Sequence, residues 1–436
     1  MPTSDQPKDK FIRDPLHGFV ELEGSEDALL ATPFVQRLTR VKQLAHSYVV
    51  FPSAVHCRLE HSLGTLYVAG KICKNLGLPP DQTAAVRAAA LLQDVGHGPF
   101  SHVFEGILRL TNDDEKFDHE KVTLAILDHD THIRDALGGT VDEVRAIIAK
   151  QRGLLSAIIS GDLDADKLDY LRRDSYHTGV AYGVFDIERV LRCVCTVPDP
   201  WTGGKFLAIE YKGMDALEGY RLARYSMTRQ VYEHHVRLTA DDMFLRAVAA
   251  ALLEGVLKKE DWVAADSHRL LQTYLKYDDQ SIVEEISRGS TGVAKQLIDD
   301  VRNRRLLKTA YELPLTDKAV PNYPTMSGLA NLDQAGATKI ESEIADKFGI
   351  QKELVIVHVQ SSKIKLYENF DRTRPEGENP ILVKLADGNS DLMENLSPFH
   401  ADRGQIRQMF IFAPKANKEQ VRDYATERWG PSYRRL

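Results

Sequence analysis

The sequence predicts a mainly α-helical protein, with a large helical body followed by a small α+β lobe. Two observations support this prediction. Between residue 32 and about residue 308, successive stretches carry the apolar periodicity and the capping residues of helices. After Pro314 the pattern changes to short β-branched runs between two helical stretches. We therefore expect a body at 11–314, a lobe at 315–436 and a polar, disordered N-terminus at 1–10.

The body begins with residues 11–22, where Asp-Pro and His-Gly turn signals predict a turn and a short strand. Thr32 is a good N-cap and Pro33 suits the first helical position, so a helix is expected at 32–44. An aromatic and β-branched run at 48–51 predicts a short strand. Further helices are expected at 60–76, 83–93, 117–128, 141–150, 154–159, 165–177, 187–194, 214–237 and 240–257, with a strand at 206–209.

The lobe is expected to mix both element types. Strands are predicted at 354–358, 363–366, 381–384 and 408–412, and helices at 339–348 and 418–429. A helical bundle that carries a smaller α+β lobe accounts for this order of elements.

Composition restricts the class of protein. The chain of 436 residues has 43% hydrophobic and 27% charged residues and a net charge of −7, which argues against nucleic acid as a partner. The basic run at 302–308 is either a solvated helix face or an anion site. The N-terminus lacks the apolar core of a signal peptide, and no stretch is apolar enough to span a membrane. We expect a cytoplasmic protein with reduced cysteines and no membrane partner.

The stretch LLQDVGHGPFSH at 91–102 is the first candidate site. It places an amide, a carboxylate and two imidazoles at the end of an apolar helix that Gly96, Gly98 and Pro99 interrupt. Buried polar groups of this kind require partners. Taken singly, His61 could be an ordinary hydrogen-bonded histidine and Asp94 a helix C-terminal residue.

Two helix faces add further candidates. Asp166, Tyr170 and Asp174 recur every four residues on one face, which favours a pocket wall over plain surface. Arg224 and Tyr232 share a face of the later helix at 214–237. The planar fork of an arginine matches phosphate oxygens, and a tyrosine can stack on a base, although surface charge beside a core tyrosine explains this second face equally well.

Four motifs together resemble a known family. RLEHSLGT (58–65), LLQDVGHGPFSH (91–102), FDHE (117–120) and DADKLDYLRRD (164–174) are similar, in this order, to motifs of the HD-domain deoxynucleoside triphosphate triphosphohydrolases. The resemblance is to the mammalian members that combine a SAM and an HD domain, without their SAM domain. It covers about residues 11–310. It implies an HD-domain helical bundle that converts a dNTP into a deoxynucleoside and inorganic triphosphate.

The resemblance also implies a role for each matching residue. His119 would protonate the leaving 5′ oxygen, with Glu120 beside it and His97 near the phosphates. The implied metal positions are His61, Gln93, Asp94 and Asp166, and the implied substrate contacts are Gln43, Leu44, Arg58, His102, Lys167, Tyr170, Asp174, Arg224 and Tyr232. The cofactor would be a divalent metal, and the sequence does not distinguish Mn, Mg, Fe, Ni and Zn. The family further implies a homo-oligomer and a nucleotide activator, with Arg304 and Lys308 as its basic contacts.

Gln93 departs from the family, which has histidine at this position. A neutral amide is a poorer ligand for transition metals than imidazole, and its oxygen suits harder ions. The chain could bind its metal with three protein ligands or bind a harder ion, or Gln93 could be an inactivating, engineered change. Alternatively, the protein is a degenerate regulatory protein that binds nucleotides without hydrolysing them, or a phosphohydrolase acting on another nucleotide.

Overall fold

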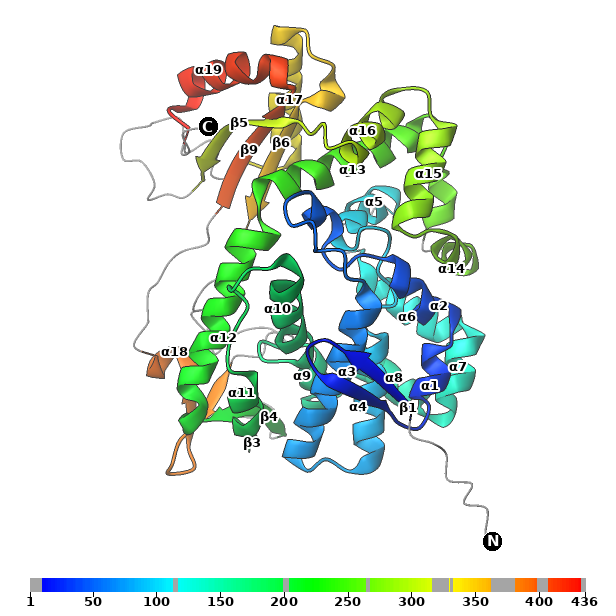
Figure 1. Cartoon of the computed structure of the whole chain (residues 1–436), viewed down its shortest axis with the longest axis vertical. Coiled ribbons are helices and arrows are strands. Elements are labelled where there is room, and N and C mark those ends of the chain that lie inside the picture. Colours follow the sequence, from blue (N-terminus) through cyan, green and yellow to red (C-terminus); the bar gives the residue numbers. More distant parts are fainter. Residues whose placement is uncertain are drawn as a thin grey trace.

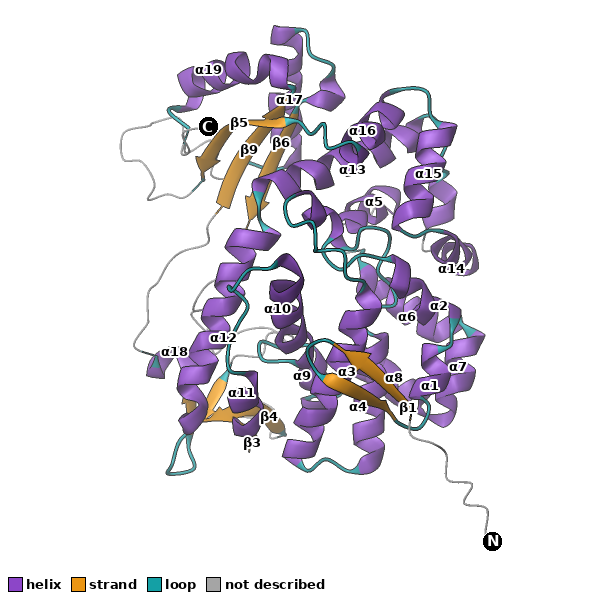
Figure 2. Ribbon diagram, viewed as in Figure 1, coloured by secondary structure: helices purple, strands orange, loops and turns teal. Residues whose placement is uncertain are grey.

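The computed structural model describes residues 10–112, 117–198, 204–263, 267–315, 329, 332–361, 381–397 and 407–432. Helices dominate, as predicted (Figures 1 and 2). They are α1 (Glu26–Leu30), α2 (Pro33–Arg37), α3 (Arg58–Leu76), α4 (Pro80–Leu92), α5 (His102–Asn112), α6 (His119–His129), α7 (Thr131–Leu137), α8 (Val141–Ile148), α9 (Leu154–Ile159), α10 (Ala165–Thr178), α11 (Ile187–Cys193), α12 (Met214–Met227), α13 (His235–Leu253), α14 (Ser267–Lys276), α15 (Asp279–Gly289), α16 (Val293–Arg302), α17 (Gln334–Phe348), α18 (Met393–Leu396) and α19 (Lys418–Trp429).

Three small sheets accompany the helices. The strands are β1 (Lys10–Asp14), β2 (Gly18–Leu22), β3 (Val194–Pro198), β4 (Lys205–Glu210), β5 (Lys308–Pro314), β6 (Ile356–Ser361), β7 (Leu382–Lys384), β8 (Ser390–Leu392) and β9 (Arg407–Ala413). They form the hairpin β1-β2, the sheet β3-β4-β7-β8 and the sheet β5-β9-β6.

The helical body is built around α3, which packs against both α4 and α10. The ends of these helices follow from local sequence. Asp164 caps α10 by accepting a hydrogen bond from the backbone of Lys167, and Gly179 ends that helix in the left-handed conformation. Gly77 ends α3 in the same way. Capped ends therefore fix where the inward-facing polar residues of α3 and α10 lie.

The C-terminal lobe has its own apolar core. Residues of β5, α17, β6, β9 and α19 form a cluster that includes Tyr311, Ile344, Ile411 and Trp429. The predicted boundary at 314/315 falls at the end of β5, which pairs antiparallel with β9. Strand β7 pairs parallel with β4 of the body, so part of 315–436 belongs to a sheet of the body. The division of the chain at 314 remains a prediction.

Several predicted elements differ from the structure. The strand predicted at 48–51 is wrong, because Ala45–Val49 is a 3₁₀ helix whose Ser47 carbonyl accepts the backbone N–H of Phe51. The helix predicted at 32–44 ends at Arg37 and continues as 3₁₀ only to Arg40. The helix predicted at 214–237 changes to a π-helical turn at Thr228–Tyr232. The strand at 363–366 and residues 1–9 lie outside the described residues.

The other lobe strands agree better with the sequence. The predicted strands at 381–384 and 408–412 correspond to β7 and β9, and the predicted helix at 418–429 corresponds to α19. No helix in the described part of the chain is long and apolar enough to cross a membrane.

Candidate active site

Three side chains from three elements form a group that we call the metal set: His61, Asp94 and Asp166. They come from α3, the turn after α4 and the first turn of α10. Nε2 of His61 lies 2.8 Å from Oδ1 of Asp166 and 3.7 Å from Oδ2 of Asp94. Potential ligand atoms of all three residues lie within 4.8 Å of one another. The set therefore offers one imidazole nitrogen and two carboxylates at a common point.

Asp169 orients the imidazole of His61. Its Oδ2 lies 2.9 Å from Nδ1 of His61, and its Oδ1 lies 2.7 Å from Nε2 of His17. Arg173 donates to the same carboxylate, so this buried charge is paired. Burial alone would lower the pKa of His61, but the carboxylates of Asp166 and Asp169 raise it to about 10. A carboxylate behind a histidine is the usual support of a metal-ligating imidazole, so these residues fit a divalent metal.

Gln93 lies beside the metal set. Its Nε2 donates a hydrogen bond of 2.8 Å to Oδ1 of Asp166. In this arrangement the amide orients a carboxylate of the set. Arg58, whose Nη1 forms an ion pair with Oδ2 of Asp94, supports the second carboxylate.

The loop between α4 and α5 brings a second group of side chains to the metal set. A Cβ on Gly96 would lie 2.2 Å from the backbone oxygen of His119, so glycine permits the close approach of α6. Phe100 and Ser101 both have positive φ, of 55° and 59°. This strained conformation is held because Asp279 accepts the N–H of Phe100 and Ser101 bonds to Arg58.

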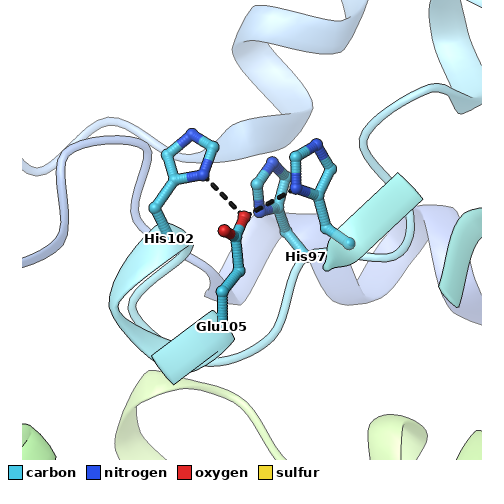
Figure 3. A group of neighbouring side chains, drawn as sticks. His97, His102 and Glu105 are labelled. Carbon is cyan, nitrogen blue, oxygen red and sulfur yellow. Dashed lines mark hydrogen bonds and ion pairs between the residues drawn. The ribbon is translucent and has the colours of Figure 1, made fainter. Parts of the chain in front are cut away.

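Four residues of this loop, α5 and α6 form what we call the histidine cluster: His97, His102, Glu105 and His119 (Figure 3). Oε1 of Glu105 lies 2.8 Å from Nδ1 of His102 and 2.7 Å from Nδ1 of His119. The rings of His97 and His119 stack with centroids 3.7 Å apart. The cluster adjoins the metal set, since Nε2 of His97 lies 3.6 Å from Oδ1 of Asp94.

The environment moves the pKa values of two histidines apart. Burial, reinforced by the Arg58 guanidinium, holds the pKa of His97 well below its usual value. Burial also acts to lower the pKa of His119, but the hydrogen bond with Glu105 and the charge of Asp94 outweigh it and raise the pKa. His119 is thus the better proton donor of the pair near neutral pH.

A cavity of about 250 Å³ lies beside the histidine cluster. Seven predicted substrate contacts line it: Gln43, Leu44, Arg58, His102, Tyr170, Asp174 and Tyr232. Ala45, Ser101 and Arg237 complete the lining. The cavity combines apolar, aromatic and polar walls, as small-molecule sites commonly do.

Asp174 is fixed in the wall of this cavity. Its Oδ2 accepts a hydrogen bond of 2.8 Å from the hydroxyl of Tyr232, and its Oδ1 lies 2.8 Å from Nε2 of buried His56. Tyr232 ends the π-helical turn that follows α12, a deviation that often occurs at functional sites. The hydroxyl of Tyr232 and the imidazole of His56 therefore hold the carboxylate of Asp174 in place as a hydrogen-bond acceptor.

A smaller cavity of about 90 Å³ lies at the metal set and is lined by Gln93, Asp94, His119 and Asp166. Lys167 also lines it, and Asp164 accepts a hydrogen bond from its Nζ. Glu120 also lines this cavity, and its side chain is half-exposed. Both of its carboxylate oxygens accept hydrogen bonds from Nζ of Lys150. Glu120 therefore faces Lys150 in this structure, although it follows His119 directly.

Three further predicted residues lie apart from these cavities' linings. Nη1 of Arg224 is 3.6 Å from Oδ1 of Asp162. Arg304 and Lys308 are exposed, and Nε of Arg304 donates to the carbonyl of Val49. Their predicted roles toward phosphate and an activator remain predictions.

Sequence reasoning missed four residues: Glu105, Asp169, His56 and Arg237. Spacing could have found the first two, since Glu105 follows His102 by three residues and Asp169 lies one turn beyond Asp166. Arg237 precedes its partner Asp241 by four residues on α13, so spacing could have found it as well. His56 carries no local signal, because its partner Asp174 lies 118 residues away in the sequence.

Comparisons with known proteins match most of the chain. The family model of the HD domain matches residues 58–174, and that of the HD associated region matches residues 185–430. The uncharacterised protein MJ1154 of Methanocaldococcus jannaschii is 31% identical over 95% of this chain and 81% of its own length. The chicken deoxynucleoside triphosphate triphosphohydrolase SAMHD1 is 27% identical over 69% of this chain, which spans 55% of that protein. A crystal structure of a phosphohydrolase from Bacteroides thetaiotaomicron has a TM-score of 0.73 and 24% identity, and covers 93% of this chain and 100% of its own.

Proposed function

The chain belongs to the HD-domain family, with the HD associated region following the domain, and on this premise we propose that it hydrolyses deoxynucleoside triphosphates. The products would be a deoxynucleoside and inorganic triphosphate. The similarity to triphosphohydrolases is at low identity, so the reaction and substrate rest on the geometry of the site.

One observation carries the proposal: Arg58 links the metal set to the larger cavity. Its Nη1 pairs with Asp94, while its Nε donates a hydrogen bond of 2.7 Å to Ser101 in the cavity wall. A nucleoside in the cavity would therefore place its 5′ phosphate at the metal set. Asp174 and Tyr232 would face the sugar, and Arg58 would offset charge on the phosphate oxygens.

The proposed reaction breaks the bond between the α-phosphorus and the 5′ oxygen. A water molecule supplies the new oxygen on phosphorus, and the 5′ oxygen leaves with a proton from His119. Because Nδ1 of His119 is hydrogen-bonded to Glu105, the transferable proton is the one on Nε2. Lys167, which lines the cavity at the metal set, would bind the phosphate chain.

The metal set would hold the divalent metal with three protein ligands. Such a cation supplies Lewis-acid stabilisation of the charge that builds on the phosphate. Two carboxylates with one imidazole suit oxygen-preferring ions such as Mg²⁺ and Mn²⁺ better than the histidine-richer set of the family does.

The reaction is tested by incubating the protein with each dNTP and Mn²⁺ or Mg²⁺ and separating the products by anion exchange. The chain as it stands and a Gln93→His variant are assayed together. Tripolyphosphate is the expected product. Its absence from both proteins with all four dNTPs removes the proposal, and orthophosphate or pyrophosphate as the product assigns a different phosphohydrolase reaction.

Gln93 favours one alternative, a regulatory protein that binds nucleotides without turnover. A thermal shift assay separates the two functions, because a bound ligand stabilises the folded state whether or not it reacts. Strong stabilisation by dNTPs, with no turnover in either the chain or its Gln93→His variant, supports the regulatory alternative.

A further inference from the structure

The histidine cluster has a donor set distinct from that of the metal set. It brings together three imidazoles and one carboxylate, and potential ligand atoms of all four residues lie within 4.8 Å of one another. Figure 3 shows the carboxylate of Glu105 pointing toward the ring of His102, with the ring of His97 close by. We propose that this cluster is a second cation site, which takes a nitrogen-preferring divalent metal such as Zn²⁺.

The donor chemistry selects the kind of ion. Imidazole nitrogen suits zinc and its neighbours, whereas carboxylate-rich sites suit magnesium and manganese. The histidine cluster is nitrogen-rich and the metal set is oxygen-rich, although Nε2 of His97 and Oδ1 of Asp94 are only 3.6 Å apart. Adjacent sites of opposite preference can hold different ions.

Two pairs of ligand atoms need little change to accept such an ion. Zinc bonds of about 2.0–2.1 Å in tetrahedral geometry place neighbouring ligand atoms about 3.3 Å apart. Oε1 of Glu105 now lies 2.8 Å from Nδ1 of His102 and 2.7 Å from Nδ1 of His119. These atoms would separate by a few tenths of an ångström. Arg109, which binds Oε2 of Glu105 at 2.9 Å, would keep the carboxylate in place.

His97 provides an independent observation. Its side chain is almost fully buried, yet within the described residues its Nδ1 has no hydrogen-bond partner. Buried polar atoms are nearly always paired, so an unpaired imidazole nitrogen beside two other imidazoles points to a missing ligand. His102, with 63% of its side chain exposed, gives the ion a route from solvent.

Occupancy of this site would have a functional consequence, which rests on the proposed function. An ion bound to Nδ1 of His119 takes the place of the proton there and prevents the ring from forming an imidazolium. The remaining proton on Nε2 is then a much weaker acid, so the leaving 5′ oxygen loses its proton donor. Zn²⁺ would then inhibit hydrolysis while Mg²⁺ or Mn²⁺ at the metal set supports it.

The site itself is tested without substrate. Metal-stripped protein is saturated with Zn²⁺, freed of loose ions by gel filtration and analysed for bound metal. Because zinc also binds oxygen-containing sets, the original chain should retain two equivalents, one at each site. His102→Ala should retain one, and so should Asp166→Asn, which disables the metal set. The exposed residue His132 provides a matched control, and His132→Ala should retain both.

Two results overturn the proposal: a single equivalent in the original chain that His102→Ala still retains, or two equivalents in His102→Ala. Glu105→Gln is a second variant that alters the same cluster and should also lose one equivalent. Because metal content is read without dNTP, the outcome is independent of whether the protein hydrolyses nucleotides. If the dNTPase assay failed but the protein retained two zinc ions, the second cation site would still be supported.

Discussion

Gln93 and His61 share one oxygen of a single carboxylate. Oδ1 of Asp166 accepts the hydrogen bond from Nε2 of Gln93 and lies 2.8 Å from Nε2 of His61. The amide thus stands where it can orient Asp166, and an imidazole in its place would add a nitrogen donor to the metal set.

The Gln93→His variant should bind nitrogen-preferring ions more tightly. We expect the affinity of the metal set for Zn²⁺ to rise about 10–100-fold, with a much smaller change for Mg²⁺. Calorimetry in the His102→Ala background isolates the metal set. Gln36→His, on an exposed position of α2, controls for an added imidazole. Equal Zn²⁺ affinities before and after the Gln93→His substitution would show that this side chain does not reach the ion.

Glu105→Gln should change the pH dependence of hydrolysis. The carboxylate helps to raise the pKa of His119, so a neutral amide lowers it, and His119 then loses its proton at lower pH. The alkaline limb of the pH–rate profile should move to lower pH, and kcat above neutrality should fall roughly 100-fold.

Tripolyphosphate release measured across pH checks this expectation. Glu143→Gln provides the matched control, since Glu143 pairs with Arg152 at the surface. An unshifted alkaline limb in Glu105→Gln would assign the proton donor to a group other than His119.

Tyr232→Phe should weaken substrate binding more than it slows the reaction. It removes the hydroxyl that fixes Oδ2 of buried Asp174, a change of about 1–2 kcal/mol and thus roughly 5–30-fold in KM. Steady-state kinetics measure KM and kcat separately, and Tyr211→Phe, at an exposed tyrosine, is the control. A loss confined to kcat would contradict a role in binding.

Gly64→Ala should disturb both the fold and the metal set. A Cβ at Gly64 would lie 2.0 Å from Oδ1 of Asp169 and 2.4 Å from Nη2 of Arg173, and both side chains are buried. We expect a loss of about 2 kcal/mol in unfolding free energy and at least about tenfold weaker metal binding, because Asp169 orients His61.

Denaturant unfolding and calorimetry measure these two effects. Gly139→Ala is the control, since a Cβ there meets no atom within 4 Å. If Gly64→Ala had the same unfolding free energy as Gly139→Ala, α3 and α10 would be able to move apart without loss of stability.

The contact between body and lobe should depend on pH. Nδ1 of His358 on β6 lies 2.8 Å from Oδ2 of Asp242 on α13. Burial acts to lower the pKa of His358, but Asp242 outweighs it and raises the pKa above 6.5. The pair therefore contributes its full stability below about pH 6.5, and this contribution is lost as pH rises through the raised pKa.

His358→Gln should consequently lower Tm at about pH 6 and have a much smaller effect at about pH 9. Thermal unfolding at both pH values checks this, with His129→Gln at an exposed position as the control. If the Tm difference between the original chain and His358→Gln instead grew with pH, the pair would stabilise the fold at high pH and the prediction would be wrong.

Helical periodicity and local motifs predict much of the fold, because they depend on residues close in sequence. The sequence predicts Tyr170 and Asp174 on one face of a helix, and both line the larger cavity. Residues 48–51 show the limit of this reasoning. Their β-branched side chains favour a strand, yet the chain folds into a 3₁₀ turn in which Val49 is buried in the main core.

The supports of the site are harder to predict, because they join distant parts of the chain. His17 and Asp169 are 152 residues apart, and His56 and Asp174 are 118 residues apart. A single sequence contains no signal for such pairs. The proposed metal ligands carry recognisable motifs, whereas the residues that orient them become visible only in three dimensions.

The parallel pairing of β4 with β7 has a consequence for biosynthesis. Ala208 of β4 lies beside Leu382, about 170 residues later in the chain. At about 5–20 residues per second, a ribosome needs roughly 10–35 s to make the intervening segment. During that time one edge of β4 lacks its neighbour, so a nascent chain that already contains every proposed catalytic residue still exposes a strand edge to other chains.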